Sequence, residues 1–348
     1  MAVRLKDIAH DLGVSTVTVS KVARGSLDVS DATRKRVLKR MAELNYRPNL
    51  VARGLASGRT YTMGLVVPDL VHPYFAEFAK ALSGILRTNS RALVITSSEE
   101  DPEVEHEEIR NLLSRGVDVL MIASCQTNLR NFFELGVNRT PYLLFDRNFP
   151  NLIANFVGSD DVAIGEMATR HLLELGRRRI AHIGARNSSP SFDRLRGYQN
   201  VLVEAGLSTS DRLVIQRERV EETGDAMGAQ MMKLLLKLKP RPDAVFCYND
   251  LTAIGAIEAI LEAGLSVPED IAIIGCGNLR YANYLRVPLS SIDQGASELG
   301  RLAGGLALEL SAMPDQEAQS IRVPPRLVAR ASTLGKVSPK KKELSVRL

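Results

Sequence analysis

The residues best suited by type and spacing to a chemical task lie in the segment from Ser15 to Arg24. Val19, Val22 and Ala23 form one apolar face of this segment at helical spacing, which leaves small and polar side chains on the other face. Hydroxyl and methyl groups can contact base edges in the major groove, and a lysine can reach guanine or a phosphate. The candidate DNA-contacting residues here are Ser15, Thr16, Val17, Thr18, Ser20, Lys21 and Arg24.

A second set of polar side chains follows predicted buried strands. Asp146 and Asn249 each come directly after an apolar run, and Arg194 lies in the segment after another such run. Ligands of parallel sheets bind beyond the carboxyl ends of the strands. A carboxylate, an amide and a guanidinium that converge there suit a hydroxyl-rich ligand. Asp146 and Asn249 could also cap the helices that follow them, and capping does not exclude binding.

Motifs for catalysis and metal binding are missing from the sequence. It contains no phosphate-binding loop, dinucleotide fingerprint or nucleophile elbow, and His106 begins a metalloprotease-like motif that has no second histidine. The other histidines lack metal-ligand spacing and are interpreted as surface or packing residues. We therefore expect no catalytic residue, no metal site and no cofactor.

The charge of the chain is unevenly distributed. Residues 1–60 hold 12 Lys and Arg against 5 Asp and Glu, a net charge of +7, whereas the remaining residues hold 33 against 35. A basic module on a nearly neutral body favours a nucleic-acid partner, and residues 336–348 form a further basic tail. No apolar run is long enough to span a bilayer, the amino terminus does not resemble a secretory signal, and three distant cysteines suggest no disulfide framework. A cytoplasmic protein without a membrane partner is expected.

Three short helices are predicted in residues 1–48. Apolar residues at helical spacing mark a first helix that ends at Gly13, and Ser15 and Ser30 can cap the second and third helices. Two short helices joined by a turn form the helix-turn-helix arrangement, whose second helix enters the major groove. The alternative is a small helical bundle that binds another protein.

The body of the chain alternates apolar strands with amphipathic helices, which predicts parallel sheets covered on both faces. There are too many strands for one sheet, so we expect two lobes, about 62–158 plus 294–322 and 159–293 plus 323–335, with a ligand cleft between them. The predicted strands are 62–67, 92–96, 117–123, 142–145, 156–157, 180–183, 213–216, 244–248, 271–274 and 290–292.

The strings DIAHDLGVSTVTVS, VSDATRKRV, ELNYRPNLVARGL and MGLVVPD occur in this order over the first 70 residues. Together they resemble the lactose/galactose repressor (LacI/GalR) family, and the resemblance extends to about residue 335. It implies an all-α helix-turn-helix DNA-binding domain in residues 1–48 and a two-lobed α/β body, residues 62–335, similar to periplasmic sugar-binding proteins. It also implies a homodimer, in some members a tetramer, that regulates transcription.

The resemblance assigns further roles. Residues 49–61 correspond to the hinge helix and linker of the family, with Asn49 and Arg53 as DNA contacts and Leu55 as the leucine inserted into the minor groove. Asp146, Arg194 and Asn249 match effector-contacting positions. The sequence departs from the family pattern at Gly277, where an aspartate is usual, and Asp293 is a possible substitute for it.

These observations predict a repressor whose affinity for a pseudo-palindromic operator depends on a small ligand, most simply a sugar or sugar derivative, bound between the lobes. A nucleobase or nucleoside is the alternative ligand. A solute-binding protein of a transport system is the alternative function for the body, although it would need an exported amino terminus.

Overall fold

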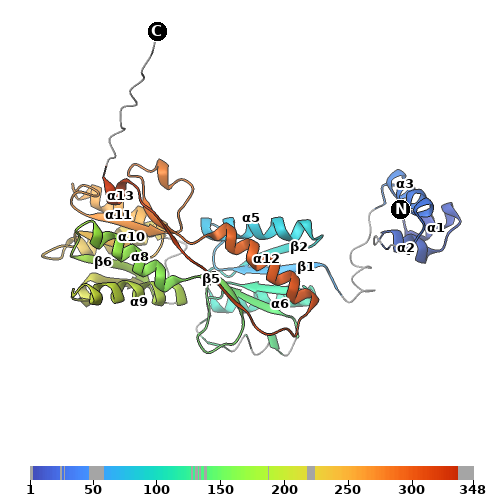
Figure 1. Cartoon of the computed structure of the whole chain (residues 1–348), viewed down its shortest axis with the longest axis horizontal. Coiled ribbons are helices and arrows are strands. Elements are labelled where there is room, and N and C mark those ends of the chain that lie inside the picture. The colour runs from blue at the N-terminus through green and yellow to red at the C-terminus, as the bar shows by residue number, and fades with distance from the viewer. Residues whose placement is uncertain are drawn as a thin grey trace, which may run out of the picture. The chain divides into compact units, whose positions relative to one another are not determined.

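The computed structural model describes residues 3–23, 26, 28–46, 59–126, 128–129, 132, 135–136, 139–186, 188–217 and 224–335 (Figure 1). The chain divides into two compact units, Met1–Thr60 and Tyr61–Leu348. Four of the predicted DNA contacts lie outside the described residues: Arg24, Asn49, Arg53 and Leu55. The basic tail 336–348 also lies outside them.

The described residues of the first unit form three helices, α1 (Leu5–Leu12), α2 (Thr16–Ala23) and α3 (Asp31–Glu43). Gly13 ends α1 with a positive φ of 64°, a conformation that favours glycine. Ser15 caps α2 by accepting from the backbone N–H of Thr18, and Ser30 caps α3 by accepting from Thr33. One apolar cluster joins the helices: Ile8, Ala9, Val19, Val22, Val37 and Met41.

The second unit consists of two α/β lobes, each built on a six-stranded sheet of the described residues. Lobe 1 has the strand order β11-β5-β4-β3-β1-β2, and every pair in it is parallel. Its strands are β1 (Thr62–Val67), β2 (Ala92–Ser97), β3 (Val119–Ile122), β4 (Tyr142–Phe145), β5 (Asn155–Ser159) and β11 (Ser320–Val323).

Lobe 2 has the strand order β12-β10-β9-β8-β6-β7, and only the edge pair β10–β12 is antiparallel. Its strands are β6 (Ile180–Ala185), β7 (Val214–Arg217), β8 (Ala244–Cys247), β9 (Ala272–Cys276), β10 (Ser290–Asp293) and β12 (Arg326–Val328). The predicted fold class is therefore confirmed. The edge strands β11 and β12 were not among the predicted strands.

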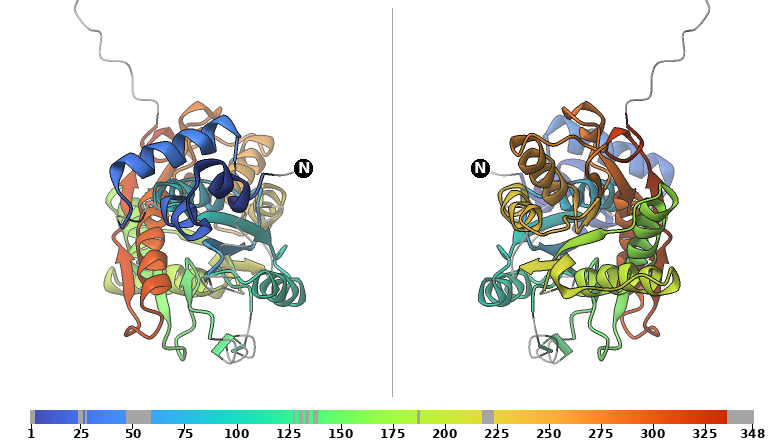
Figure 2. Two further views of the ribbon diagram at one scale, coloured as in Figure 1. Left: turned by 90° about the vertical axis from the view of Figure 1, so that its right-hand side faces the viewer. Right: turned by 90° about the vertical axis from the view of Figure 1, so that its left-hand side faces the viewer.

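Helices cover both faces of each sheet, because each sheet is apolar on both sides. In lobe 1, α5 (Pro73–Thr88) and α12 (Ala296–Ala312) pack on one face and α6 (Pro102–Ser114) on the other. In lobe 2, α8 (Asp161–Glu174) and α9 (Ser189–Glu204) lie on one side (Figure 2). On its other side are α10 (Gly224–Leu236) and α11 (Asp250–Glu262), and α13 (Ala331–Leu334) follows β12.

The helices α8 and α9 approach each other through glycine. A Cβ atom added at Gly165 would lie 2.1 Å from the carbonyl oxygen of Arg194, and one added at Gly197 would lie 2.1 Å from that of Val162. Side chains at these positions would hold the helices apart. The close approach places Arg194 of α9 against Asp161, the first residue of α8.

Candidate functional site

The amino-terminal end of α2, together with its capping residue Ser15, carries the most exposed of the predicted DNA-contacting side chains that the structure describes. Ser15, Thr16 and Val17 are exposed, and Val17 keeps 60% of its surface accessible although it is apolar. Val19 and Val22, on the other face, are buried in the core of the unit. This arrangement leaves the amino-terminal end of α2 open for contact with another molecule.

The other predicted residues of α2 are less accessible. Thr18, Ser20 and Lys21 are half-buried, and the ammonium of Lys21 lies 3.4 Å from a carboxylate oxygen of Asp28. Because the two groups are 3.4 Å apart and both are in contact with solvent, this ion pair is weak. A phosphate could take the place of the Asp28 carboxylate beside Lys21.

Part of the positive charge in this unit stabilises the three helices. The guanidinium of Arg36 donates to the carbonyl of Leu12 at 3.1 Å, and that of Arg40 donates to the carboxylate of Asp11 at 2.6 Å. Both contacts join α3 to α1. The basic composition therefore overstates the number of side chains that are free to contact DNA.

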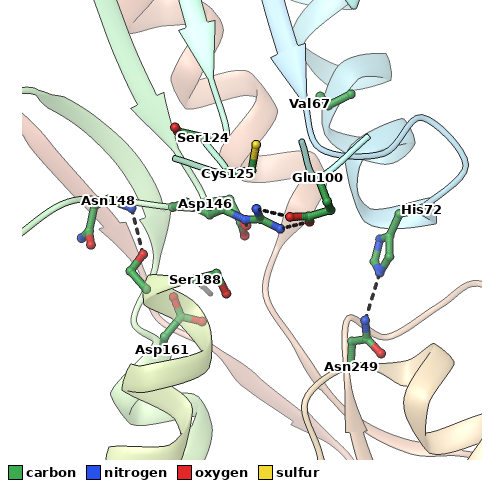
Figure 3. A network of polar contacts seen from close by, with 12 residues as sticks. Val67, His72, Glu100, Ser124, Cys125, Asp146, Asn148, Asp161, Ser188 and Asn249 are labelled. Atoms are coloured by element: carbon green, nitrogen blue, oxygen red, sulfur yellow. Dashed lines mark hydrogen bonds and ion pairs between the residues drawn. The ribbon is translucent and has the colours of Figure 1, made fainter. Parts of the chain in front are cut away.

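In the second unit, three chain segments cross between the lobes. They follow β5 at Ser159, β10 at Asp293 and β11 at Val323. The residues that come after the strands of the two lobes form a buried polar cluster between them, part of which is shown in Figure 3.

Arg194 is the most extensively bonded residue of this cluster. It is 2% exposed, and its Nε donates to Asp161 Oδ1 at 2.8 Å. Its Nη1 donates to the carbonyl of Tyr248 at 2.7 Å, and its Nη2 to Oε1 of Gln294 at 2.7 Å. Burial raises the pKa of Asp161 to about 7, although the guanidinium of Arg194 acts in the opposite direction.

Asn249 both caps a helix and reaches the other lobe. Its Oδ1 accepts from the backbone N–H of Thr252 at 2.9 Å, so the expected capping of α11 is present. Its Nδ2 lies 3.3 Å from Nε2 of His72, at the start of α5 in lobe 1 (Figure 3). Burial lowers the pKa of His72 to about 4, so this histidine is neutral at pH 7.

Asp146 follows β4 with a φ of 60°, and its buried side chain lies among charged neighbours. The next residue, Arg147, pairs through both terminal nitrogens with the carboxylate of Glu100 (Figure 3). Arg147 and Glu100 are both buried. The sequence did not point to this pair, because the two residues are distant in the chain.

A cavity of about 330 Å³ lies between the lobes beside this cluster. It is lined from lobe 1 by Ser124, Gln126, Arg147, Asn148, Phe149 and Pro150, and from lobe 2 by Arg186, Ser188, Ser189, Phe192 and Asp193. The backbone N–H of Asn148 donates to the hydroxyl of Ser189 at 2.9 Å, which joins the two walls (Figure 3). The cavity is large enough for a small ligand.

None of the four predicted effector contacts, Asp146, Arg194, Asn249 and Asp293, is among the residues that line this cavity. The first three belong to the polar cluster beside it, whereas Asp293 lies at a crossover. One of its carboxylate oxygens accepts from the backbone N–H of Gly295 at 2.8 Å, and the other pairs with Arg326 at 3.0 Å. Gly277 has a φ of 124°, which disfavours any side chain there. A Cβ atom at Gly277 would lie 3.8 Å from the carboxylate of Asp250 and 4.0 Å from the amide nitrogen of Gln294.

Comparison with known proteins assigns both units. Residues 4–49 match the model of bacterial regulatory proteins of the lacI family, and residues 169–333 match a periplasmic binding protein-like domain. The chain is 34% identical over 329 residues to the ribose operon repressor of Haemophilus influenzae, covering 94% of this chain and 98% of that protein. The chain belongs to the lacI family. The resemblance predicted from its sequence is confirmed.

Solved structures of lacI-family proteins have the same fold. The lac repressor dimer bound to operator and an anti-inducer superposes with a TM-score of 0.84 at 26% identity, covering 96% of this chain and all of that one. The CelR–cellobiose complex superposes with a TM-score of 0.72 at 28% identity, covering 95% and 99%.

The chain is therefore a DNA-binding repressor with an effector-binding body, and it belongs to a family without enzymatic activity. No helix among the described residues is long and apolar enough to cross a membrane. The described residues also contain no cluster of potential metal ligands.

Proposed function

We propose that the repressor is a cytoplasmic homodimer that binds a pseudo-palindromic operator through α2 of each subunit. The exposed residues Ser15, Thr16 and Val17 meet base edges, and Lys21 meets a phosphate or guanine. Asn49, Arg53 and Leu55 belong to the hinge segment that contacts the centre of the operator. The likeness to a lac repressor dimer bound to its operator supports this proposal.

The effector in our proposal is a neutral, hydroxyl-rich molecule, a sugar or sugar derivative. Two buried arginines in the region between the lobes carry this proposal, because each already has a carboxylate partner within its own lobe: Arg194 pairs with Asp161, and Arg147 pairs with Glu100. A phosphate or carboxylate would have to displace one of these carboxylates, which would leave a buried charge without its partner. A sugar hydroxyl can both donate and accept, so it can bond to Asp146, Arg194 or Asn249 without displacing a charge.

Both oxygens of Asp293 are engaged at the crossover, so we do not include it among the effector contacts. A related protein is solved in complex with cellobiose, which is consistent with a sugar as the ligand class.

A nucleobase or nucleoside is the second candidate. Phe149 and Phe192 line the cavity from opposite lobes, and Phe192 is 54% exposed although it is aromatic. An aromatic ring can stack on a flat base, and it can equally pack against the apolar face of a sugar ring. The aromatic residues therefore do not separate the two classes, and binding has to be measured.

The test is a thermal-shift screen of the full chain with three panels: neutral sugars, their phosphorylated forms, and nucleobases with nucleosides. A ligand at 100 times its dissociation constant stabilises the folded state by about 2.7 kcal/mol. We expect hits among neutral sugars that are lost in Arg194→Ala and are not improved by phosphorylation. Hits confined to phosphorylated compounds or to bases would overturn the proposed ligand class.

A further inference from the structure

The three crossover segments are bonded to one another. The hydroxyl of Ser159 donates to the backbone carbonyl of Gln294 at 2.9 Å, which joins the first crossover to the second. The backbone N–H of Asp160 donates to the carbonyl of Val323 at 3.3 Å, which joins the first to the third. A change in the angle between the lobes must therefore strain or rearrange these bonds.

Arg194 contacts two of these crossovers through one rigid group. Its Nε binds Asp161, which starts α8 directly after the first crossover, and its Nη2 binds the side chain of Gln294 in the second. The guanidinium is planar, so these two contacts cannot move independently of each other. The carbonyl of Tyr248 accepts a third hydrogen bond from it.

Gln294 is bonded on two sides. It is 5% exposed, its main-chain carbonyl accepts from Ser159, and its side-chain oxygen accepts from Arg194. Its amide nitrogen lies toward Gly277, within 4.0 Å of the position that a Cβ atom there would occupy. This is an ordinary van der Waals distance, so only a side chain longer than alanine at position 277 would compete with the glutamine amide for space.

We infer that Gln294 is a positioning residue that holds the lobes at one angle by joining Arg194 to the crossover between β10 and α12. This inference rests on the proposed function, in which a ligand between the lobes contacts Arg194. A hydrogen bond of 2.7 Å from a buried cation is short and strong, so a displacement of the guanidinium is passed on to Gln294. Ligand contact with Arg194 would then change the geometry of the crossover directly, and this is how the cleft influences the arrangement of the lobes.

The test measures the distance between the lobes in the full chain without any ligand. Spin labels are attached at Glu107→Cys on α6 and Val203→Cys on α9, both exposed, while the native cysteines are buried. Each doubly labelled chain is refolded with an excess of the same unlabelled chain, so that a labelled protomer of the proposed homodimer has an unlabelled partner and only the distance within one protomer is measured. Double electron–electron resonance is then recorded for the labelled parent, Gln294→Met, Gln294→Asn and Gln294→Glu. The first substitution removes the acceptor, the second shortens the side chain, and the third keeps both the length and the acceptor.

We expect one narrow distance distribution for the parent and for Gln294→Glu, and a second population for Gln294→Met and Gln294→Asn. The matched control is Arg326→Met, which removes the exposed ion pair of Asp293 at the same crossover and should leave the distribution unchanged. The inference is overturned if Met and Asn give the parent distribution, if Glu behaves like Met, or if the control shifts equally. Because no ligand is added, the result does not depend on whether the effector is a sugar.

Discussion

Replacing Gly165 by alanine should separate α8 from α9 and disrupt the cleft from a distance. The added methyl carbon would lie 2.1 Å from the carbonyl oxygen of Arg194, whereas real Cβ contacts do not fall below 3.0 Å. The helices must therefore move apart by about 1 Å, a typical case of overpacking. The bond of 2.8 Å from Arg194 to Asp161 would then exceed the length of a hydrogen bond.

Overpacking of this kind destabilises a protein by about 1–3 kcal/mol. The loss of the buried contact adds to this, so we expect a decrease of about 3 kcal/mol in the free energy of unfolding. For a body of this size that corresponds to a fall of about 6–12 °C in Tm. The assay is thermal unfolding followed by circular dichroism, together with urea titration of the same samples.

The matched control is Gly305→Ala in α12, where an added Cβ atom has no neighbour within 4 Å. Alanine forms helices better than glycine, so this variant should gain up to about 1 kcal/mol. The reasoning is refuted if Gly165→Ala is as stable as the parent, or if the two alanine variants lose stability equally.

Three further predictions concern other parts of the chain. Burial lowers the pKa of His72 from 6.5 to about 4, so the unfolded state binds more protons at this residue between these pH values. The contribution of His72 to the free energy of unfolding should therefore fall by about 2 kcal/mol between pH 8 and pH 5, which is read as a change in the stability difference between the parent and a variant without the histidine. His72→Asn keeps a helix-capping side chain and should lose this contribution; urea titrations that show the same stability difference between parent and variant at both pH values would contradict it. Replacing Thr16 and Val17 together by alanine should relax the sequence preference by about 1–3 kcal/mol for each lost base contact, and an unchanged profile in a binding-site selection would count against α2 as the reading helix. The logarithm of operator affinity should fall linearly with that of the salt concentration, at about −0.9 per neutralised phosphate, and an anisotropy titration with no salt dependence would exclude phosphate contacts.

The strands that could be predicted from the sequence are those with an uninterrupted buried run. Thr62–Val67 and Tyr142–Phe145 match β1 and β4 from end to end, because such apolar runs fit only a sheet covered on both faces. The strand β11 was missed, since its residues Ser320–Val323 alternate exposed polar positions with half-buried Ile321 and buried Val323 at the edge of a sheet. A run of four residues with only two apolar side chains is too short to distinguish a strand from a loop.

For the region between the lobes, the sequence predicted individual polar residues but not the residues that they contact. Asp146 and Asn249 could be predicted because each follows a recognisable strand, and the structure places both in the polar cluster near Arg194. Gln294, which bonds to Arg194 at the crossover, has no local sequence pattern that predicts this contact. The same is true of His72, which contacts Asn249. Such pairs depend on how the two lobes meet, which one sequence does not specify.

The completion of lobe 1 by α12 and β11 has a consequence for how the protein is made. The strand β5 ends at Ser159, but the strand that covers its open edge ends at Val323. At about 5–20 residues per second, a ribosome needs on the order of ten seconds or more to make the intervening chain. During this time the nascent lobe has an unpaired strand edge and an apolar sheet face that is not yet covered by Leu299, Ala303 and Leu306 of α12. A chain released before this point exposes both surfaces permanently, so premature termination should yield aggregates rather than a shortened repressor.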